Sequence, residues 1–288
     1  MGSNGIVKLL KPAHHLDRGS VNVITVHIDE ELSIQTAIAK EKQMSGYKFD
    51  LGGQQAIVTG ASKGLGAAIA IALADCGARV LAVARSEEEL RAMARRQPLI
   101  EPWVADIRAP SFASELAARE VDILINNAGM NRPLPMADVP VEVLDEMLSL
   151  NIRSAYLVAQ AAVRSMLRRD KGGCIINVTS QMGHVGSPNR TVYCMTKHAL
   201  EGLTKAMAVE LAAERIRVNS VAPTFVETPM TERMLADPAF LSFVERMIPL
   251  GRIAQPGDVS AAVLYLCSPL AAMVTGSSLV IDGGWTAQ

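Results

Sequence analysis

From Gln54 to the C-terminus, short apolar runs alternate with longer segments of helical periodicity. Strands separated by helices of ten or more residues need crossover connections, and right-handed crossovers place successive strands parallel in one sheet. The alternation therefore predicts an α/β fold, a doubly wound, seven-stranded parallel sheet with helices on both faces. The expected strands are Ala56–Thr59, Val80–Ala84, Ile100–Ala105, Ile123–Asn126, Ile175–Thr179, Val218–Ala222 and Ser278–Ile281.

The same pattern indicates the domain organisation. The chain shows no internal repeat and no low-complexity linker, so residues 51–288 are predicted to form one domain. Residues 1–50 hold one strand-like run and one short helical segment, and neither connects to a motif. We predict that they form an N-terminal extension. The expected helices are Leu65–Cys76, Glu87–Arg96, Ser111–Ala118, Val141–Arg169, Val192–Ala213 and Pro256–Leu266.

Composition disfavours several classes of partner. Hydrophobic residues make up 49% of the 288 residues and charged residues 20%, which suits a protein with a large core. The formal net charge is -1, so no overall field favours nucleic acid or an anionic membrane. The four cysteines are widely spaced, and the most apolar stretch is too short to cross a bilayer. We expect a cytoplasmic protein with reduced thiols and without a metal site.

A glycine-rich turn, TGASKGLG (59–66), directly follows the first expected strand. Gly60 permits the tight turn, Gly64 lets the backbone approach a pyrophosphate, and Gly66 allows the next helix to pack closely. The start of that helix offers free N–H groups and a positive dipole end to phosphates. Glycine-rich loops are common, but a strand before and a helix after are the context of dinucleotide binding in a Rossmann fold.

The end of the second expected strand bears on the choice between NAD and NADP. An acid there would bind the ribose hydroxyls of NAD, but Ala84 occupies the position and Arg85 follows. Arg85 and Lys63 can converge on a 2′-phosphate, unless both are only solvated surface charges. We therefore favour NADP(H) and leave NAD(H) open. Asp106, after the third strand, is placed to accept a hydrogen bond from an adenine amino group.

Tyr193 and Lys197 lie four residues apart in a strongly helical segment, and therefore on one helix face. A free phenol has a pKa of about 10 and is a poor base at neutral pH. Because a neighbouring ammonium favours the phenolate, we expect Lys197 to lower the pKa of Tyr193. Such a pair is common on protein surfaces, so its meaning depends on the residues around it.

Three further features accompany this pair. Ser180 follows a strand at the sheet edge where open α/β folds bind ligands, and its hydroxyl can donate to a substrate carbonyl oxygen. Its alternative role is to cap a turn. Asn126–Gly129 closes the fourth strand and suits a tight turn beside the cofactor. Asn151 lies inside a helical segment, where asparagine is mildly unfavourable and needs a backbone hydrogen bond or a held water.

TGASKGLG (59–66), NNAG (126–129), Asn151, Ser180 and YCMTK (193–197) resemble, in order and spacing, the short-chain dehydrogenase/reductase family. The resemblance covers roughly residues 50–288. It implies that Tyr193 is the general acid/base, that Lys197 lowers its pKa and binds the nicotinamide ribose, and that Ser180 positions the substrate oxygen. It also implies that Asn151 holds a water in a proton relay.

The resemblance further implies which residues line the cofactor and substrate sites. Pro223–Thr228 matches the segment that grips the nicotinamide, except that Thr224 stands where the family usually has glycine. The implied cofactor contacts are Gly60, Ser62, Lys63, Gly64, Leu65, Gly66, Arg85, Asp106, Ile107, Asn127, Ala128, Gly129, Tyr193, Lys197, Pro223, Val226 and Thr228. The substrate contacts are Ser180, Gln181, Met182, Tyr193 and Thr224, with His184, Asn189 and Phe225 as further candidates.

Within the family, the sequence most resembles L-xylulose reductases and related sugar or polyol dehydrogenases. The expected reaction is reversible hydride transfer between NADP(H) and a secondary alcohol or ketone of a sugar, polyol or sugar acid. Reduction of a 3-oxoacyl thioester or a cyclic ketone is the alternative, because these substrates share the scaffold. A non-catalytic NADP-binding regulator is less favoured, since Asn151, Ser180, Tyr193 and Lys197 are all present.

Two expectations concern larger segments. Thr231–Pro249, which contains Met234, Leu235, Phe240 and Phe243, predicts either a mobile lid over the site or a fixed pair of helices. The family resemblance implies a homotetramer that forms through the last strand and the helices carrying Asn151 and Tyr193. It would bring Trp285 towards a neighbouring subunit.

Overall fold

The computed structural model describes residues 49–288, within which seven strands form one parallel sheet. The strand order β3-β2-β1-β4-β5-β6-β7 reverses between β1 and β4, as in a doubly wound fold, and the predicted fold class is confirmed. The predictions for residues 1–48 lie outside the described residues. The strands are β1 (Gln55–Thr59), β2 (Arg79–Ala84), β3 (Ile100–Val104), β4 (Ile123–Asn126), β5 (Gly173–Val178), β6 (Ile216–Pro223) and β7 (Ser278–Ile281).

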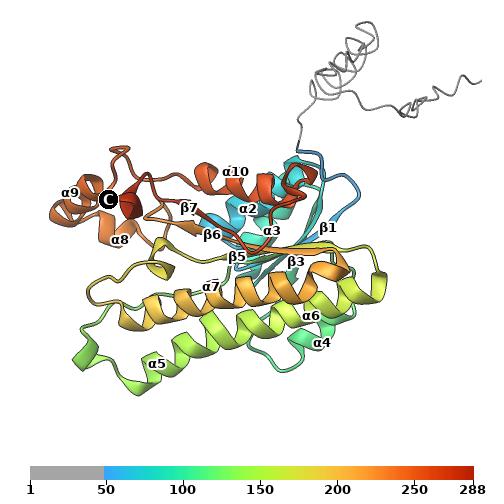
Figure 1. The fold of residues 1–288 in the computed structure, drawn as a ribbon, viewed down its shortest axis with the longest axis horizontal. Coiled ribbons are helices and arrows are strands. Elements are labelled where there is room, and N and C mark those ends of the chain that lie inside the picture. The colour runs from blue at the N-terminus through green and yellow to red at the C-terminus, as the bar shows by residue number, and fades with distance from the viewer. Residues whose placement is uncertain (1–48) are drawn as a thin grey trace, which may run out of the picture. The chain divides into compact units, whose positions relative to one another are not determined.

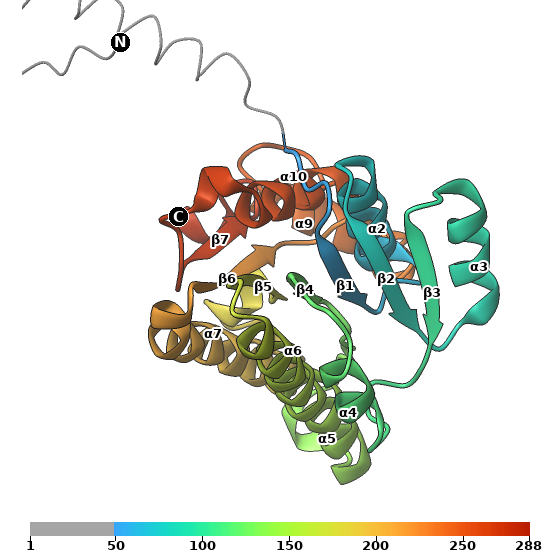
Figure 2. The ribbon, with the colours of Figure 1, turned by 90° about the vertical axis from the view of Figure 1, so that its right-hand side faces the viewer.

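Helices cover both faces of the sheet. Figure 1 shows α2, α3 and α10 on one face and α4, α5, α6 and α7 on the other, and Figure 2 shows the same division at right angles. Between residues 49 and 288, no helix combines the length and apolar character needed to cross a bilayer. The helices are α2 (Gly64–Asp75), α3 (Glu87–Arg96), α4 (Phe112–Ala117), α5 (Val141–Leu148), α6 (Ala155–Arg169), α7 (Thr191–Leu211), α8 (Glu232–Leu235), α9 (Pro238–Met247) and α10 (Pro256–Cys267).

The central strands are apolar along their whole length because both of their faces are covered. In β1, Ala56 and Val58 belong to the core beneath α2 and α10, whereas Ile57 packs in the core beneath α4 and α6. Ile57 pairs in register with Leu81 of β2 and Leu124 of β4. Successive side chains of a strand therefore enter two different cores, which fixes the register of the sheet.

One predicted helix is divided in the structure. The stretch Val141–Arg169, expected to be a single helix, consists of α5 and α6 joined by a π-helical turn over Ser149–Ser154. π-turns are uncommon and are frequent at functional sites. This turn contains Asn151, the asparagine that the sequence singled out as unfavourable in a regular helix.

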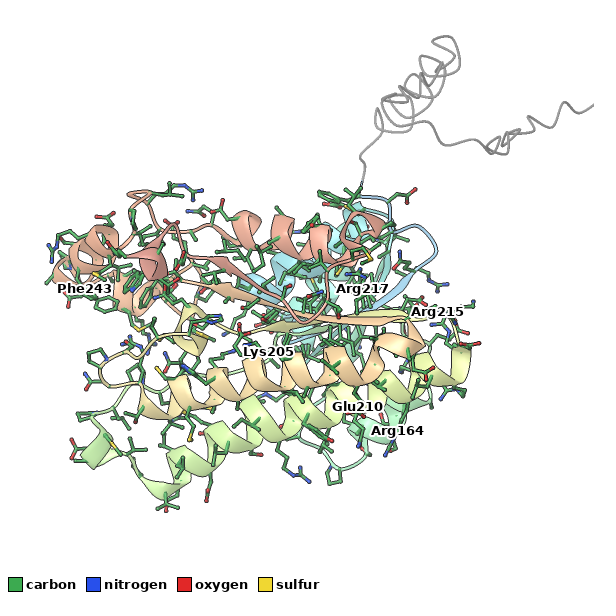
Figure 3. The ribbon with its side chains drawn as sticks, in the orientation of Figure 1. Arg164, Lys205, Glu210, Arg215, Arg217 and Phe243 are labelled. Atoms are coloured by element: carbon green, nitrogen blue, oxygen red, sulfur yellow. The ribbon has the colours of Figure 1, made fainter. Side chains whose placement is uncertain are left out.

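The carboxyl ends of the strands all lie at one edge of the sheet, since every pairing in it is parallel. In Figure 3, Arg215, just before β6, and Phe243, in α9, lie at opposite ends of the ribbon. The short helices α8 and α9 are therefore found near the carboxyl ends, where open α/β sheets bind their ligands.

Candidate active site

A cavity of about 610 Å³ opens at the carboxyl ends of the strands. Its volume is in the range of small-molecule and cofactor sites. All the residues that the sequence predicted to contact cofactor line it, and so do the five predicted substrate contacts Ser180, Gln181, Met182, Tyr193 and Thr224. The glycine turn and Tyr193, which lie far apart in the sequence, thus face one space.

The glycine turn has the backbone that a pyrophosphate needs. Gly60 and Gly64 both have positive φ (67° and 58°), a conformation that favours glycine. A Cβ atom at Gly66 would lie 2.2 Å from the Gly60 carbonyl oxygen, so the start of α2 packs against the turn without a side chain. Within residues 49–288, no acidic side chain occupies the first turn of α2, and Lys63 makes no side-chain cap there. The N–H groups at this helix start are therefore suited to a phosphate.

The NNAG segment (126–129) forms hydrogen bonds with this turn. The Asn127 side-chain amide donates to the carbonyl oxygen of Thr59 (2.8 Å) and to that of Gly60 (3.3 Å). In return, the Thr59 hydroxyl accepts from the main-chain N–H groups of Asn127 (3.0 Å) and Ala128 (3.1 Å). The two loops that would hold the cofactor are thus fixed to each other by hydrogen bonds rather than by packing alone.

Cations line the part of the cavity next to β2. Lys63 and Arg85 are exposed and line it, and Arg108 joins them; their binding of a 2′-phosphate stays a prediction. Arg108 also forms an ion pair with Asp106, to which two of its side-chain nitrogens donate hydrogen bonds of 2.7 and 3.1 Å. These hydrogen bonds hold the pKa of Asp106 below its usual range. Asp106 therefore lines the cavity and orients Arg108, a cation that the sequence pattern did not reveal, and its contact with adenine stays a prediction.

Asn151 is buried behind the cavity wall and does not line it. Its Oδ1 accepts from the Met130 N–H (2.9 Å), and its amide donates to the Met130 carbonyl (2.8 Å) and to Thr196 Oγ1 (3.2 Å). A Cβ atom on Gly129 would lie 3.3 Å from that Oδ1 and 3.8 Å from Lys197 Nζ. The hydrogen bonds to the Met130 backbone are the reason that a helical asparagine requires, and the contact with Thr196 ties the π-turn to α7.

Tyr193 and Ser180 both line the cavity. The Ser180 hydroxyl accepts from the Met182 N–H (3.2 Å) and donates to the Pro223 carbonyl (3.4 Å), so it also caps a turn. Burial raises the pKa of the Tyr193 phenol to about 12, although a hydrogen bond with Ser180 acts in the opposite direction. A phenol in this state is neutral at pH 7 and holds a proton that it can donate.

The pKa of Tyr193 is raised overall, whereas the sequence predicted that Lys197 would lower it. Its ammonium lies 5.5 Å from the centre of the Tyr193 ring and donates to the Val178 carbonyl (2.8 Å). Burial lowers the pKa of Lys197 to about 8, against an opposing attraction from Glu201. The expectation failed because it counted the charge of one neighbour and not the desolvation of the phenol.

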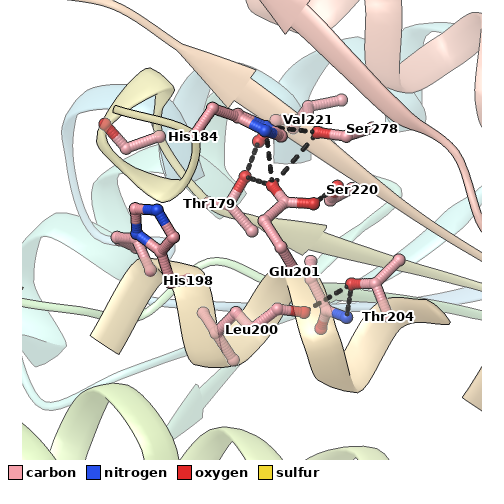
Figure 4. A network of polar contacts seen from close by, with 12 residues as sticks. Thr179, His184, His198, Leu200, Glu201, Thr204, Ser220, Val221 and Ser278 are labelled. Carbon is pink, nitrogen blue, oxygen red and sulfur yellow. Dashed lines mark hydrogen bonds and ion pairs between the residues drawn. The ribbon is translucent and has the colours of Figure 1, made fainter. Parts of the chain in front are cut away.

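Glu201 is a buried carboxylate that the sequence reasoning missed. Figure 4 shows it accepting hydrogen bonds from Ser220 (2.7 Å), Ser278 (3.0 Å) and Thr179. Its spacing of four residues after Lys197 would have indicated it, because Tyr193, Lys197 and Glu201 share one face of α7. The Glu201 carboxylate thus stabilises the ammonium of Lys197, on the same helix face as Tyr193.

Two of the further substrate candidates lie outside the cavity lining. His184 is exposed, with Nε2 2.9 Å from Ser278 Oγ and 3.3 Å from Glu201 Oε1. Asn189 is also exposed, with a positive φ of 60°, and its carbonyl accepts from the Leu134 N–H. Phe225 does line the cavity. His184 and Asn189 are therefore not among the residues that face the cavity.

The segment after β6 forms α8 and α9, a packed pair of helices. Met234 lines the cavity, while Phe240 meets Phe225 and Phe243 meets Trp285 in edge-to-face contacts. Opening of this pair and approach of Trp285 to a neighbouring subunit stay predictions. Among the described residues, no three acidic, histidine or cysteine side chains gather as a metal site would require.

Comparison with known proteins agrees with this geometry. A family model described as "Enoyl-(Acyl carrier protein) reductase" matches residues 60–286. L-xylulose reductase of Bos taurus is 42% identical over 240 residues, covering 82% of this chain and 98% of that enzyme. D-threitol dehydrogenase of Mycolicibacterium smegmatis is 36% identical over 250 residues, covering 83% of this chain and 95% of its own length.

The similarity extends to the three-dimensional structure of a solved relative. The gluconate 5-dehydrogenase from Burkholderia cenocepacia J2315, in complex with NADP and tartrate, superposes with a TM-score of 0.79 at 32% identity. The match covers 83% of this chain and 98% of that one. With the sheet order, the glycine turn and the cavity at Tyr193, these matches establish that the chain belongs to the short-chain dehydrogenase/reductase family of enzymes that act on alcohol and ketone groups.

Proposed function

We propose that this chain catalyses reversible hydride transfer between NADP(H) and a secondary alcohol or ketone of a sugar, polyol or sugar acid. The single observation that carries the proposal is the shared cavity, in which the glycine turn and Tyr193 face one space of about 610 Å³. A cofactor held at the turn can thus extend to the residues that handle the substrate oxygen. Every lining residue falls within 60–234, so residues 51–288 are proposed to carry the activity.

Each side chain has a task in the reduction of a ketone. When bound, the reduced nicotinamide supplies a hydride to the carbonyl carbon. Tyr193 gives its proton to the carbonyl oxygen as general acid, and Ser180 donates a hydrogen bond to the same oxygen. Lys197 stabilises the phenolate that remains and binds the ribose, while Asn151 holds the relay that returns a proton. In the oxidative direction the same groups act in reverse order.

The choice of NADP rests on charge. Lys63, Arg85 and Arg108 line the cavity, and Ala84 stands where an NAD-selecting carboxylate would be expected at the end of β2. Guanidinium groups suit a 2′-phosphate because of their forked donors. The related gluconate 5-dehydrogenase binds NADP, which supports the same assignment here.

The substrate class rests on the relatives and on polar atoms in the cavity. Both named enzymes, L-xylulose reductase and D-threitol dehydrogenase, act on sugars or polyols. Among residues 49–288, the buried Gln181 Oε1, Asn131 Oδ1 and Thr224 Oγ1 have no hydrogen-bond partner, and all three residues line the cavity. A hydroxylated substrate would satisfy them, because buried polar groups are stable only when paired.

Replacement of Tyr193 tests the proposal directly. Tyr193→Phe keeps the ring and removes the proton donor, so turnover of ketoses with NADPH should fall by about 10²- to 10⁴-fold. NADPH binding, followed by fluorescence titration, should stay unchanged. Wild-type protein that binds NADPH tightly but reduces no ketose, diketone or cyclic ketone would instead favour the non-catalytic regulator.

Assembly and location complete the proposal. We propose a homotetramer, supported by apolar side chains that lie exposed on α6 and α7, among them Tyr156, Met195 and Val209. We also propose a cytoplasmic enzyme, because the four cysteines are free thiols and three of them are buried.

A further inference from the structure

Arg190 is a buried cation at the substrate end of the cavity. It immediately precedes α7, three residues before Tyr193, and only 9% of its surface is exposed. It lines the cavity together with Gln181 and Thr224. Nothing in the sequence singled it out, because an arginine beside a helix start is ordinarily solvated.

The guanidinium is held in place by weak contacts. One terminal nitrogen donates to the Pro188 carbonyl (3.3 Å), and the other approaches the Met234 sulfur (3.4 Å). The group also lies over the rings of Phe225 (5.8 Å) and Phe240 (5.9 Å). These contacts fix its direction, but none of them supplies a negative charge.

The charge of Arg190 has no counterpart within residues 49–288. No aspartate or glutamate oxygen of this region forms an ion pair with it, and its buried Nε has no hydrogen-bond partner. Two other arginines of the cavity lining differ, since the half-buried Arg108 pairs with Asp106 and the exposed Arg132 with Glu146. A buried cation without a paired anion is costly, and such groups are normally matched by a partner or a ligand.

We propose that Arg190 binds a carboxylate of the substrate, so that the enzyme prefers sugar acids and their keto acids to neutral ketoses and polyols. This inference rests on the proposed function, whose substrate class it narrows. A carboxylate would supply the missing charge and accept from the free Nε–H, as in the strong pairs between guanidinium and carboxylate groups. A neutral hydroxyl would satisfy the hydrogen bond but not the charge.

The position of Arg190 also suits the reaction. Its ring partner Phe225 follows Thr224, and the Ser180 hydroxyl bonds to the adjacent Pro223 carbonyl. Arg190 and Ser180 therefore border the same segment at the end of β6. A substrate whose ketone oxygen meets Ser180 and Tyr193 can direct a carboxylate at its other end towards the guanidinium.

Binding to matched ligands tests the inference without turnover. D-gluconate and D-sorbitol differ only in a carboxylate that replaces a terminal CH₂OH group. With the full chain and saturating NADPH, which cannot oxidise either alcohol, calorimetry should give a Kd for D-gluconate at least about tenfold below that for D-sorbitol, the lower bound for a charged hydrogen bond. Equal affinities, or a preference for D-sorbitol, would overturn the inference even in the wild-type protein.

Variants of Arg190 then test whether this side chain causes the preference for a carboxylate. Arg190→Met keeps a long apolar side chain beside Phe225 and Phe240, and should raise the KM for 5-keto-D-gluconate by about tenfold to a hundredfold. The kcat for this keto acid, and the kcat/KM for the neutral ketose L-sorbose, should change by less than about threefold. Arg190→Lys should recover part of the lost affinity, because it restores the charge.

The matched control is Arg132→Met, which removes an arginine that lines the cavity but already has Glu146 as its partner. It should leave the preference for the carboxylate in place. Equal losses on both substrates in Arg190→Met would show that Arg190 only supports Tyr193, and would refute the inference. Absence of turnover with every carbonyl would instead count against the proposed function, and the gluconate titration would still decide the role of Arg190.

Discussion

Tyr193 carries its proton at neutral pH, because burial raises the pKa of its phenol to about 12. Reduction of a ketone needs a proton donor of this kind, whereas oxidation of an alcohol needs the phenolate. The residues of the chain thus favour protonation of a ketone oxygen, and oxidation requires extra positive charge beside the phenol. A bound oxidised nicotinamide is positively charged and would contribute in that direction.

Arg85 provides the test of cofactor choice at the scale of one residue. Arg85→Ala should raise the KM for NADPH by about tenfold or more and leave the KM for NADH nearly unchanged, because only NADPH carries the 2′-phosphate. Steady-state kinetics with both cofactors measures this ratio. Similar changes for NADPH and NADH would remove Arg85 from the phosphate site.

Lys197 should make stability depend on pH. Its pKa is about 8 in the folded protein and 10.5 when unperturbed, so between these values the unfolded chain binds more protons and stability rises with pH. At about 1.4 kcal/mol per pKa unit, the gain is about 3 kcal/mol. Urea denaturation at pH 7.5 and 10.5 should show this gain in wild type and lose it in Lys197→Met.

The control for this experiment is Lys205→Met, which removes an exposed lysine of the same helix (Figure 3). This variant should keep the wild-type dependence on pH. If Lys197→Met also keeps it, the ammonium of Lys197 is not desolvated in the folded protein.

Among the elements, the junction of β1 and α2 depends most on the absence of a side chain. In Gly66→Ala the new Cβ would meet the Gly60 carbonyl oxygen at 2.2 Å, so the backbone must shift. We expect a loss of about 1–3 kcal/mol in stability and a marked loss of NADPH affinity. Gly202→Ala in α7 is the matched control, since its Cβ meets open space. It should add about 0.5–1 kcal/mol, and denaturation with NADPH titration measures both variants.

The helices and strands also show which structural features local sequence patterns can predict. Strand and helix positions followed from periodicity, since alternation and helical spacing are properties of neighbouring residues. The π-turn at Ser149–Ser154 did not, because it depends on the bonds of Asn151 to Met130 and to Thr196, in other parts of the chain. The sequence pattern could identify Asn151 as unusual in a helix, but it could not identify Met130 and Thr196 as its hydrogen-bond partners.

For the whole molecule, the exposed apolar side chains of α6 and α7 predict self-association. Val209 is 83% exposed on α7, which lies beside α6 on the same face of the sheet (Figure 1). Val209→Lys should convert tetramers into smaller species in sedimentation experiments, because a charge buried in an interface is costly. Met136→Lys, at an exposed apolar residue outside these helices, should leave the tetramer intact. A monomeric wild type would contradict the proposed assembly.

The sequence by itself determined the fold class, the glycine turn and the residues Ser180, Tyr193 and Lys197, because these signals are local or lie in family motifs. Tertiary structure decided the state of the site. The phenol pKa rose because burial outweighed the hydrogen bond with Ser180 and the charge of Arg190. Arg108 and Arg190 joined the cavity lining, and Glu201 found its partners Ser220 and Ser278, because folding brought distant parts of the chain together. Desolvation and long-range pairing depend on atoms that no local pattern contains, so these properties emerged only from the folded chain.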